Sequence, residues 1–172
     1  YALELFRKAP DLDVLYVPIG QGSGICGCIM ARDLLGLSTE IVGVQSTAAP
    51  SYALSFAAGK VVSTNSSDTR ADGMATRVPD ADALAIIAHG ASRIVQVTDD
   101  EIAAAIMAYW TDTHNLAEGA GAAPLAAALQ EKAKIAGKRV GLILSGGNID
   151  FELFRSWVMP DAVSVPQMRA AV

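Results

Sequence analysis

Short apolar runs rich in β-branched residues alternate with helix-like segments along most of this 172-residue chain. The first kind ends at glycine-rich or polar turns, as buried strands do, and the second kind carries helix caps and periodic apolar residues. Strands that alternate with helices favour a parallel sheet with helices on its faces, so we predict an α/β fold. Strands are expected at 13–20, 40–45, 60–64, 93–98 and 139–144, and helices at 24–36, 51–59, 80–90, from 99 onward, 122–137 and 150–158.

Local signals define two of these helices. Thr98 and Glu101 have the spacing of a capping box at a helix start. An apolar stripe then runs from Ile102 to Trp110, which places Trp110 in the core rather than against a cofactor. Proline is tolerated only in the first turn of a helix, so Pro124 predicts that the Ala-rich helix starts close before it.

Composition and charge exclude several classes of protein. The chain is 52% hydrophobic and 18% charged, which indicates a globular domain rather than a disordered segment. A net charge of −5 without a Lys/Arg cluster argues against a nucleic-acid partner, and no apolar run is long enough to span a membrane. Cys26 and Cys28 lie too close together for an ordinary disulfide and lack further zinc ligands, so we expect reduced thiols in a cytoplasmic protein.

Two glycine-rich turns follow predicted strands. The segment "VPIGQGSGICG" (17–27) stands between a strand and a helix, and "SGGN" (145–148) follows the last strand. Ligands of a parallel sheet bind beyond the carboxyl ends of its strands. Exposed N–H groups at a helix start bind anions, so the 20–24 loop predicts a phosphate site.

Dinucleotide binding is one alternative for this loop. Gly22, Gly24 and Gly27 satisfy the spacing G-x-G-x-x-G after a strand and before a helix. A nicotinamide enzyme usually carries Asp or Glu at the end of the next strand, to bind the ribose hydroxyls. Gln45 stands there instead, so dinucleotide binding remains only a second candidate.

Four motifs in order resemble the second half of fold-type II pyridoxal-phosphate enzymes, the tryptophan synthase β-like fold. They are "VPIGQGSGICG" (17–27), "ADG" (71–73), "AEGAGAAPLAAAL" (117–129) and "LILSGGN" (142–148). The threonine/serine dehydratase and serine racemase branch is the most similar. The motifs are spread over most of the chain, and their common order makes the resemblance specific.

The resemblance implies which residues hold pyridoxal 5'-phosphate. Backbone N–H groups of the 20–24 loop would wrap its phosphate, and the Ser145 hydroxyl would hydrogen-bond the pyridine nitrogen, a partner that fits a neutral ring and β-elimination. Glu118 would lie near the cofactor edge, and Gly146 and Gly147 would leave room for the ring. The loop consists of Gly20, Gln21, Gly22, Ser23 and Gly24, in which Gln21 and Ser23 replace glycines of the family pattern. A position with positive φ would tolerate such a change poorly.

The resemblance also bears on metal. The serine racemase branch often binds a divalent cation just after the second strand, through Glu and Asp. The matching positions here are Gln45 and Ser51, with Ala49 between them. None of these side chains is ionised, and hard cations prefer charged oxygen ligands, so we predict no metal at this place.

The family's Schiff-base lysine lies in the first half of its chain, in a Ser/Thr-Phe-Lys context that is absent here. We therefore expect no catalytic residue in this chain, and we interpret it as the C-terminal half of an enzyme, inactive alone. Residues 1–158 would be the half that binds the cofactor phosphate, with 159–172 as an unassigned tail. The lysines are Lys8, Lys60, Lys132, Lys134 and Lys138.

The expected activity of the whole enzyme is that of a dehydratase, or ammonia-lyase, acting on threonine or serine. β-Elimination and hydrolysis would yield a 2-oxo acid and ammonia. A racemase or a hydroxyectoine-pathway relative remains open, and the alternative class is a non-catalytic phosphate- or dinucleotide-binding α/β module. The expected partners are a small amino-acid substrate and further copies of the same chain in a homo-oligomer.

Overall fold

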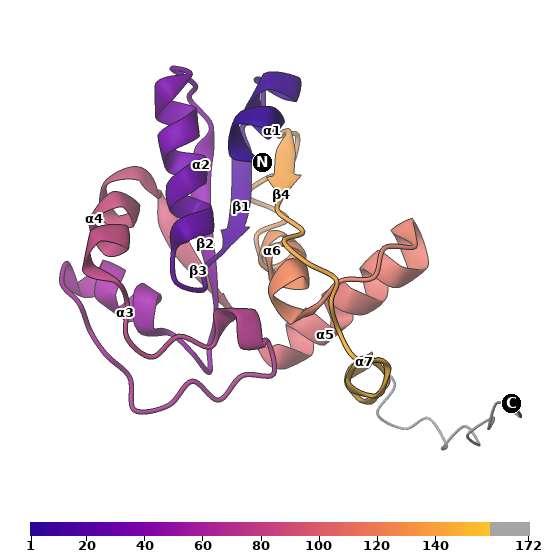
Figure 1. Cartoon of the computed structure of the whole chain (residues 1–172). Coiled ribbons are helices and arrows are strands. Elements are labelled where there is room, and N and C mark those ends of the chain that lie inside the picture. The colour runs from indigo at the N-terminus through magenta and orange to yellow at the C-terminus, as the bar shows by residue number, and fades with distance from the viewer. Residues whose placement is uncertain (159–172) are drawn as a thin grey trace, which may run out of the picture.

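The computed structural model describes residues 1–158, which form a four-stranded parallel sheet between two layers of helices (Figure 1). This confirms the predicted α/β architecture, and the predicted tail at 159–172 lies outside the described residues. The strands are in the order β3-β2-β1-β4. They are β1 (Val14–Pro18), β2 (Glu40–Ser46), β3 (Arg93–Val97) and β4 (Val140–Leu142).

The helices connect successive strands or cover their faces. Two short irregular turns accompany them, the 3₁₀ turn η1 (Asp72–Met74) and the π-helical turn η2 (Tyr109–Thr113). The α-helices are α1 (Ala2–Lys8), α2 (Ser23–Leu34), α3 (Ser51–Ala58), α4 (Ala81–Gly90), α5 (Asp99–Ala108), α6 (Gly119–Gln130) and α7 (Phe151–Val158).

The sheet is buried on both faces, as its continuous apolar strands require. On β1, Val14 and Tyr16 point toward the core under α5 and α6, whereas Leu15 and Val17 point toward the core under α1, α2 and α4. Figure 1 shows these helices on opposite sides of the sheet. Because all four strands are parallel, their carboxyl ends lie at the same edge of the sheet, where a ligand can reach them.

The prediction of a strand at 60–64 is wrong, because the structure has no strand there. The N–H of Val62 donates to Ser55 Oγ at 2.8 Å, and the N–H of Thr64 donates to the Arg77 carbonyl at 2.9 Å. These contacts hold the segment against α3 and a neighbouring loop. Its β-branched residues therefore do not join the sheet, because tertiary contacts override strand propensity.

The helix predicted at 122–137 is displaced. α6 begins at Gly119 and ends at Gln130, so Pro124 is its sixth residue and lies beyond the first turn. The expectation that Pro124 lies in the first turn is wrong. α6 therefore lacks the hydrogen bond that a residue with an N–H would make to the Ala120 carbonyl. After Gln130 the chain continues in turns, with the N–H of Lys134 bound to the Glu131 carbonyl at 2.8 Å.

The capping box of α5 is confirmed, but its apolar stripe ends early. The N–H of Thr98 donates to the Glu101 carboxylate at 2.7 Å, and the N–H of Glu101 donates to Thr98 Oγ1 at 3.2 Å. Ile102 is buried as expected, but the π-helical turn follows α5 before Trp110 can enter the core. Trp110 is 49% exposed and packs edge-on against Phe154, so its predicted core position is wrong.

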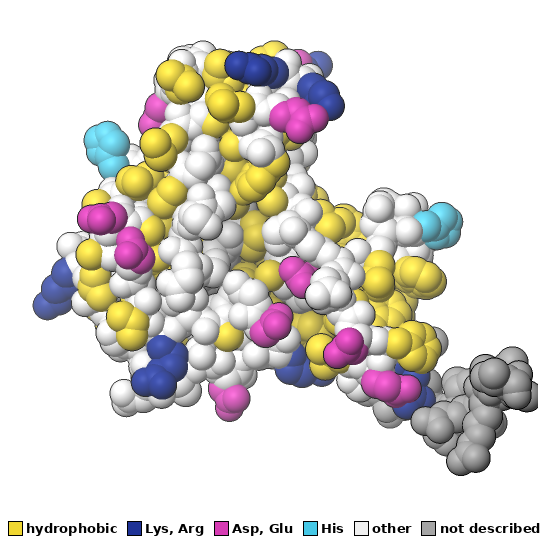
Figure 2. Space-filling model, viewed as in Figure 1, with side chains coloured by type: hydrophobic (Ala, Val, Ile, Leu, Met, Phe, Trp, Pro, Cys, Tyr) yellow, Lys and Arg dark blue, Asp and Glu magenta, His cyan; other side chains and the backbone are white. Residues whose placement is uncertain are grey.

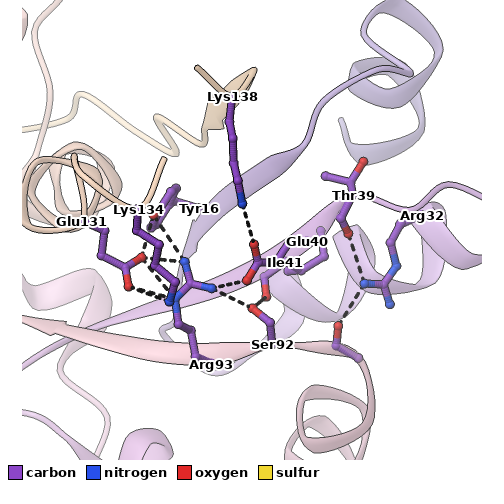
Figure 3. Close-up of polar contacts among 11 residues, drawn as sticks. Tyr16, Arg32, Thr39, Glu40, Ile41, Ser92, Arg93, Glu131, Lys134 and Lys138 are labelled. Carbon is purple, nitrogen blue, oxygen red and sulfur yellow. Dashed lines mark hydrogen bonds and ion pairs between the residues drawn. The ribbon is translucent and has the colours of Figure 1, made fainter. Parts of the chain in front are cut away.

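A partly buried ionic cluster lies at the amino ends of the strands, opposite the ligand edge (Figure 3). Arg93 of β3 contacts Glu40 of β2, and its guanidinium lies 2.6 Å from the carboxylate of Glu131 beyond α6. Tyr16 of β1 donates to the same carboxylate at 2.6 Å. Burial alone would raise the pKa of Glu131, but the hydrogen bonds from Arg93 and Tyr16 lower it to about 2. The cluster joins three strands to the end of α6.

All five lysines lie on the surface. Lys8 pairs with Glu4 at 2.9 Å. Figure 3 shows that Lys134 and Lys138 extend the ionic cluster through Glu131 and Glu40. These three lysines therefore form ion pairs.

Apolar side chains are also exposed. Figure 2 shows hydrophobic side chains gathered over α1 and α2, where Leu3, Met30 and Leu34 line an apolar groove of about 540 Å³. Within residues 1–158, none of the helices combines the length and the hydrophobicity of a membrane-spanning segment.

Candidate functional site

A cavity of about 260 Å³ lies at the carboxyl ends of β1 and β4. Its walls come from the 20–24 loop after β1, from Gly73 of η1, from Ala120 of α6, and from Ile143 and Ser145 after β4. The structure thus brings all five predicted loop residues together with Ser145, more than 100 residues later in the sequence. Glu118, Gly146 and Gly147 do not line this cavity.

The loop keeps glycine where the backbone requires it. Gly22 has φ of +96°, and a Cβ there would lie 2.8 Å from Ala83 Cβ. A Cβ on Gly20 would overlap the carbonyl oxygen of Gly73. Gln21 and Ser23 do not have positive φ, which explains how they can replace glycines.

Side chains behind the loop bind its carbonyl groups. Thr76 Oγ1 donates to the Gly20 carbonyl at 3.0 Å, and the Tyr52 hydroxyl donates to the Gln21 carbonyl at 2.7 Å. In a trans peptide the next N–H points to the side opposite the carbonyl. The N–H groups of Gln21 and Gly22 are therefore directed away from these partners. Within residues 1–158, the N–H groups of the loop have no hydrogen-bond acceptor.

The start of α2 adds a favourable field for an anion. Gly22 is the N-cap of this 12-residue helix, and its carbonyl accepts from the Cys26 N–H at 3.0 Å. The N–H groups of Ser23 and Gly24 belong to the first turn and have no intrahelical acceptor. The first turn carries no acidic side chain that would compete for them. This end of the cavity can therefore bind a phosphate-sized anion.

Ser145 lines the same cavity from the loop after β4. Its side chain is exposed, and its hydroxyl makes no hydrogen bond to any residue of the described part of the chain. A hydroxyl in this position can donate to or accept from a ligand atom.

Gly146 and Gly147 are needed for close backbone packing. The N–H of Glu118 donates to the Gly146 carbonyl at 3.1 Å. A Cβ on Gly146 would overlap the Glu118 carboxylate, and one on Gly147 would overlap the Leu116 carbonyl. These contacts account for both glycines without a ligand, and room for a cofactor ring stays a prediction.

Glu118 belongs to a neighbouring polar pocket of about 210 Å³, which Asp72 and Asp150 also line. Burial raises the pKa of Glu118, and the negative charge of Asp72 raises it further. Its predicted place at the edge of a cofactor stays a prediction.

Gln45 and Ser51, at the position where we predict no metal, both form hydrogen bonds within the protein. Gln45 is fully buried, and its Oε1 accepts from the Ala53 N–H at 2.8 Å. Ser51 Oγ donates to the Thr76 carbonyl at 2.7 Å. Among residues 1–158, no three His, Cys, Asp or Glu side chains gather in a way that could hold a metal ion. Gln45 itself carries no carboxylate for the ribose of a dinucleotide.

Two residues behind the loop, Tyr52 and Thr76, escaped the sequence analysis. They lie on α3 and just after η1, far from the loop in sequence, and neither belongs to one of the four motifs. Tyr1 is a third such residue, because its hydroxyl donates to the Gly24 carbonyl at 3.1 Å. No local pattern marks a side chain that supports a loop from a distant segment.

Comparisons with known proteins show the family to which the chain belongs. A family model described as "Pyridoxal-phosphate dependent enzyme" matches residues 1–146. The chain is 41% identical to the L-threonine ammonia-lyase of Geobacter sulfurreducens, over 86% of this chain and 37% of that protein. It is 32% identical to the L-threo-3-hydroxyaspartate ammonia-lyase of Saccharomyces cerevisiae, over 91% of this chain and 48% of that protein.

A solved structure shows the same fold. The processed form of threonine deaminase isoform 2 from Solanum lycopersicum superposes with a TM-score of 0.86 at 29% identity, covering 94% of this chain and 48% of that one. The chain thus spans less than half the length of each of these relatives. The matched family model covers most of the chain, and we conclude that the chain belongs to the family of pyridoxal-phosphate-dependent enzymes.

Proposed function

We propose that residues 1–158 form the part of a pyridoxal-phosphate-dependent lyase that holds the cofactor's phosphate and ring nitrogen. The observation that carries this proposal is the cavity that the 20–24 loop and Ser145 line together, in which the loop N–H groups have no acceptor among residues 1–158. A Cβ on Gly20 or Gly22 would overlap atoms of Gly73 or Ala83, so glycine at these positions lets the loop keep the backbone conformation that leaves its N–H groups without a protein acceptor. The residues present therefore fit the cofactor.

Each group of the cavity has a distinct task in this proposal. The N–H groups of the loop bind the phosphate and anchor the cofactor, without protonating it. The Ser145 hydroxyl orients the ring by hydrogen bonding to its nitrogen, and a neutral hydroxyl leaves that nitrogen unprotonated. Pyridoxal phosphate supplies, when bound, an electron sink for chemistry at the α-carbon of an amino acid.

The substrate we propose is threonine or serine. A threonine would lose its β-hydroxyl as water, and hydrolysis would then release ammonia and leave 2-oxobutanoate, so that the atoms balance overall. The similarity to a threonine ammonia-lyase and a hydroxyaspartate ammonia-lyase supports a β-hydroxy amino acid. A serine racemase of Schizosaccharomyces pombe, 32% identical, makes racemisation the competing activity.

The test of the proposed activity uses the full-length parent protein. We expect formation of 2-oxo acid and ammonia from L-threonine and L-serine, with little D-serine. Preference for threo-3-hydroxyaspartate, or D-serine as the main product, would contradict the proposed substrate and reaction. The proposed cytoplasmic location and homo-oligomeric state are separate expectations, and the exposed apolar side chains over α1 and α2 support association.

In the parent enzyme, we expect Ser145→Ala to retain the cofactor and to lower the elimination rate about tenfold. The change removes one hydrogen bond to the ring, worth about 0.5–1.5 kcal/mol net, and leaves the phosphate contacts intact. The measurements are kcat with threonine and the absorption spectrum of the bound cofactor. Ser92→Ala, at the opposite edge of the sheet, is the control and should match the unaltered enzyme. Unchanged kinetics and spectrum in Ser145→Ala would remove Ser145 from the site.

A further inference from the structure

The orientation of the 20–24 loop depends on side chains that do not reach the cavity. We propose that Tyr52 and Thr76 are positioning residues, which hold the loop's carbonyl groups so that its N–H groups face the anion; this inference rests on the proposed function. Neither residue lines the cavity. Their effect therefore acts through the loop backbone.

The Tyr52 hydroxyl joins three separate segments. It donates to the Gln21 carbonyl at 2.7 Å and accepts from the Asp80 N–H at 3.1 Å. Asp80 in turn caps α4 through the Ala83 N–H at 2.8 Å. Tyr52 is fully buried, and burial raises the pKa of its hydroxyl, so the proton remains available for donation near neutral pH. The loop is thereby tied to α3 and to the start of α4.

The same hydroxyl contacts the residue with positive φ. A Cβ on Gly22 would lie 3.0 Å from the Tyr52 oxygen, so the hydroxyl occupies the space that a side chain at Gly22 would need. Tyr52 thus holds the peptide before Gly22 by a hydrogen bond and excludes a side chain at Gly22 itself.

Thr76 holds the preceding peptide in the same way. Its side chain is 4% exposed, and Oγ1 donates to the Gly20 carbonyl at 3.0 Å. Its own carbonyl accepts from Ser51 Oγ at 2.7 Å, which fixes the backbone that carries the donor. Two successive peptides of the loop, 20–21 and 21–22, are therefore each held by one buried hydroxyl.

Glycine makes this support necessary. Gly20 and Gly22 flank the two peptides, and glycine permits backbone rotations that would turn an N–H away from the anion. A site that is already oriented loses less free energy when it binds its ligand. Removing either hydroxyl also leaves a partly buried carbonyl without this partner, which favours rotation of that peptide.

The experiment titrates the ¹⁵N-labelled 172-residue chain with inorganic phosphate and follows the amide resonances of the 20–24 loop. Tyr52→Phe and Thr76→Val each remove one hydroxyl without removing bulk. We expect each variant to raise the Kd for phosphate about tenfold. Thr76→Ser retains the hydroxyl and should keep the Kd of the unaltered chain.

Tyr16→Phe is the matched control, because it removes a tyrosine hydroxyl that donates to Glu131 at 2.6 Å in the ionic cluster. We expect it to lower the Tm while leaving the phosphate Kd unchanged. An equal rise in Kd for Tyr16→Phe would show that general destabilisation is the cause and would overturn the positioning role. So would unchanged affinity in both Tyr52→Phe and Thr76→Val. If phosphate leaves the loop resonances of the unaltered chain unchanged, the proposed function fails, and the inference fails with it.

Discussion

The Gly22→Ala variant is expected to lose measurable phosphate binding and to lower the free energy of unfolding by about 2–5 kcal/mol. At φ of +96° an alanine is strained, at a cost of about 1–3 kcal/mol. Its methyl group would also lie 2.8 Å from Ala83 Cβ and 3.0 Å from the Tyr52 oxygen. Relief of this overlap would move the loop whose N–H groups form the anion site. Chemical denaturation and phosphate titration measure the two effects.

Gly27→Ala is the control in the same helix. A Cβ on Gly27 would meet no atom within 4 Å, and the residue lies in the interior of α2 with ordinary φ. Replacement of a helical glycine by alanine should stabilise the fold by about 0.5–1 kcal/mol and leave phosphate binding intact. If Gly22→Ala matched Gly27→Ala in both measurements, the conformation of the loop described above would be wrong.

The second large effect is the absence of activity: the 172-residue chain alone should show no threonine dehydratase activity above that of free pyridoxal phosphate. Chemistry at the α-carbon requires a lysine that joins the cofactor and moves the proton. None of the chain's five lysines lines the cavity, and three of them form ion pairs elsewhere. Incubation with pyridoxal phosphate and threonine, followed by assay of 2-oxobutanoate, measures this directly.

The control for that assay is free cofactor at the same concentration. An unrelated carrier protein is added to it, so that the concentration of exposed lysine amines equals that in the sample. Turnover well above this background, lost when one of the five lysines is changed to arginine, would show that the chain carries its own catalytic lysine. The inactive chain should nevertheless bind phosphate, because the loop lies entirely within it.

The fold was largely predictable, because strand and helix signals are local. The β-branched runs that became β1, β2 and β3 lie between clear turns, and Thr98 and Glu101 marked the start of α5 correctly. The parallel arrangement then follows from the alternation of strands and helices.

The errors arise where distant contacts decide the local structure. Val62 lies in a strand-like run, but Ser55 binds its N–H, so no strand forms. α6 starts at Gly119, where a Cβ would meet Trp157 and Ala71, neighbours that no sequence pattern reveals. The π-helical turn at the end of α5 left Trp110 half-exposed for a similar reason.

The residues of the candidate site were also predictable only where the signal lies within a short segment. Glycine spacing and motif order were sufficient to find the 20–24 loop and Ser145, because these features are contained in short segments. Tyr52 and Thr76 could not be found, because their importance depends on the carbonyl each one faces. The contacts that crowd Gly146 and Gly147 were missed for the same reason.

The central claim is that the 20–24 loop holds the cofactor's phosphate while Ser145 meets its ring nitrogen. A crystal structure of the chain with pyridoxamine 5'-phosphate, which lacks the aldehyde that reacts with surface lysines, tests it most directly. The account predicts phosphate oxygens within hydrogen-bonding distance of the N–H groups from Gln21 to Gly24, and the pyridine nitrogen beside Ser145 Oγ. A ligand bound elsewhere, or a loop whose N–H groups point away from the phosphate, would contradict it.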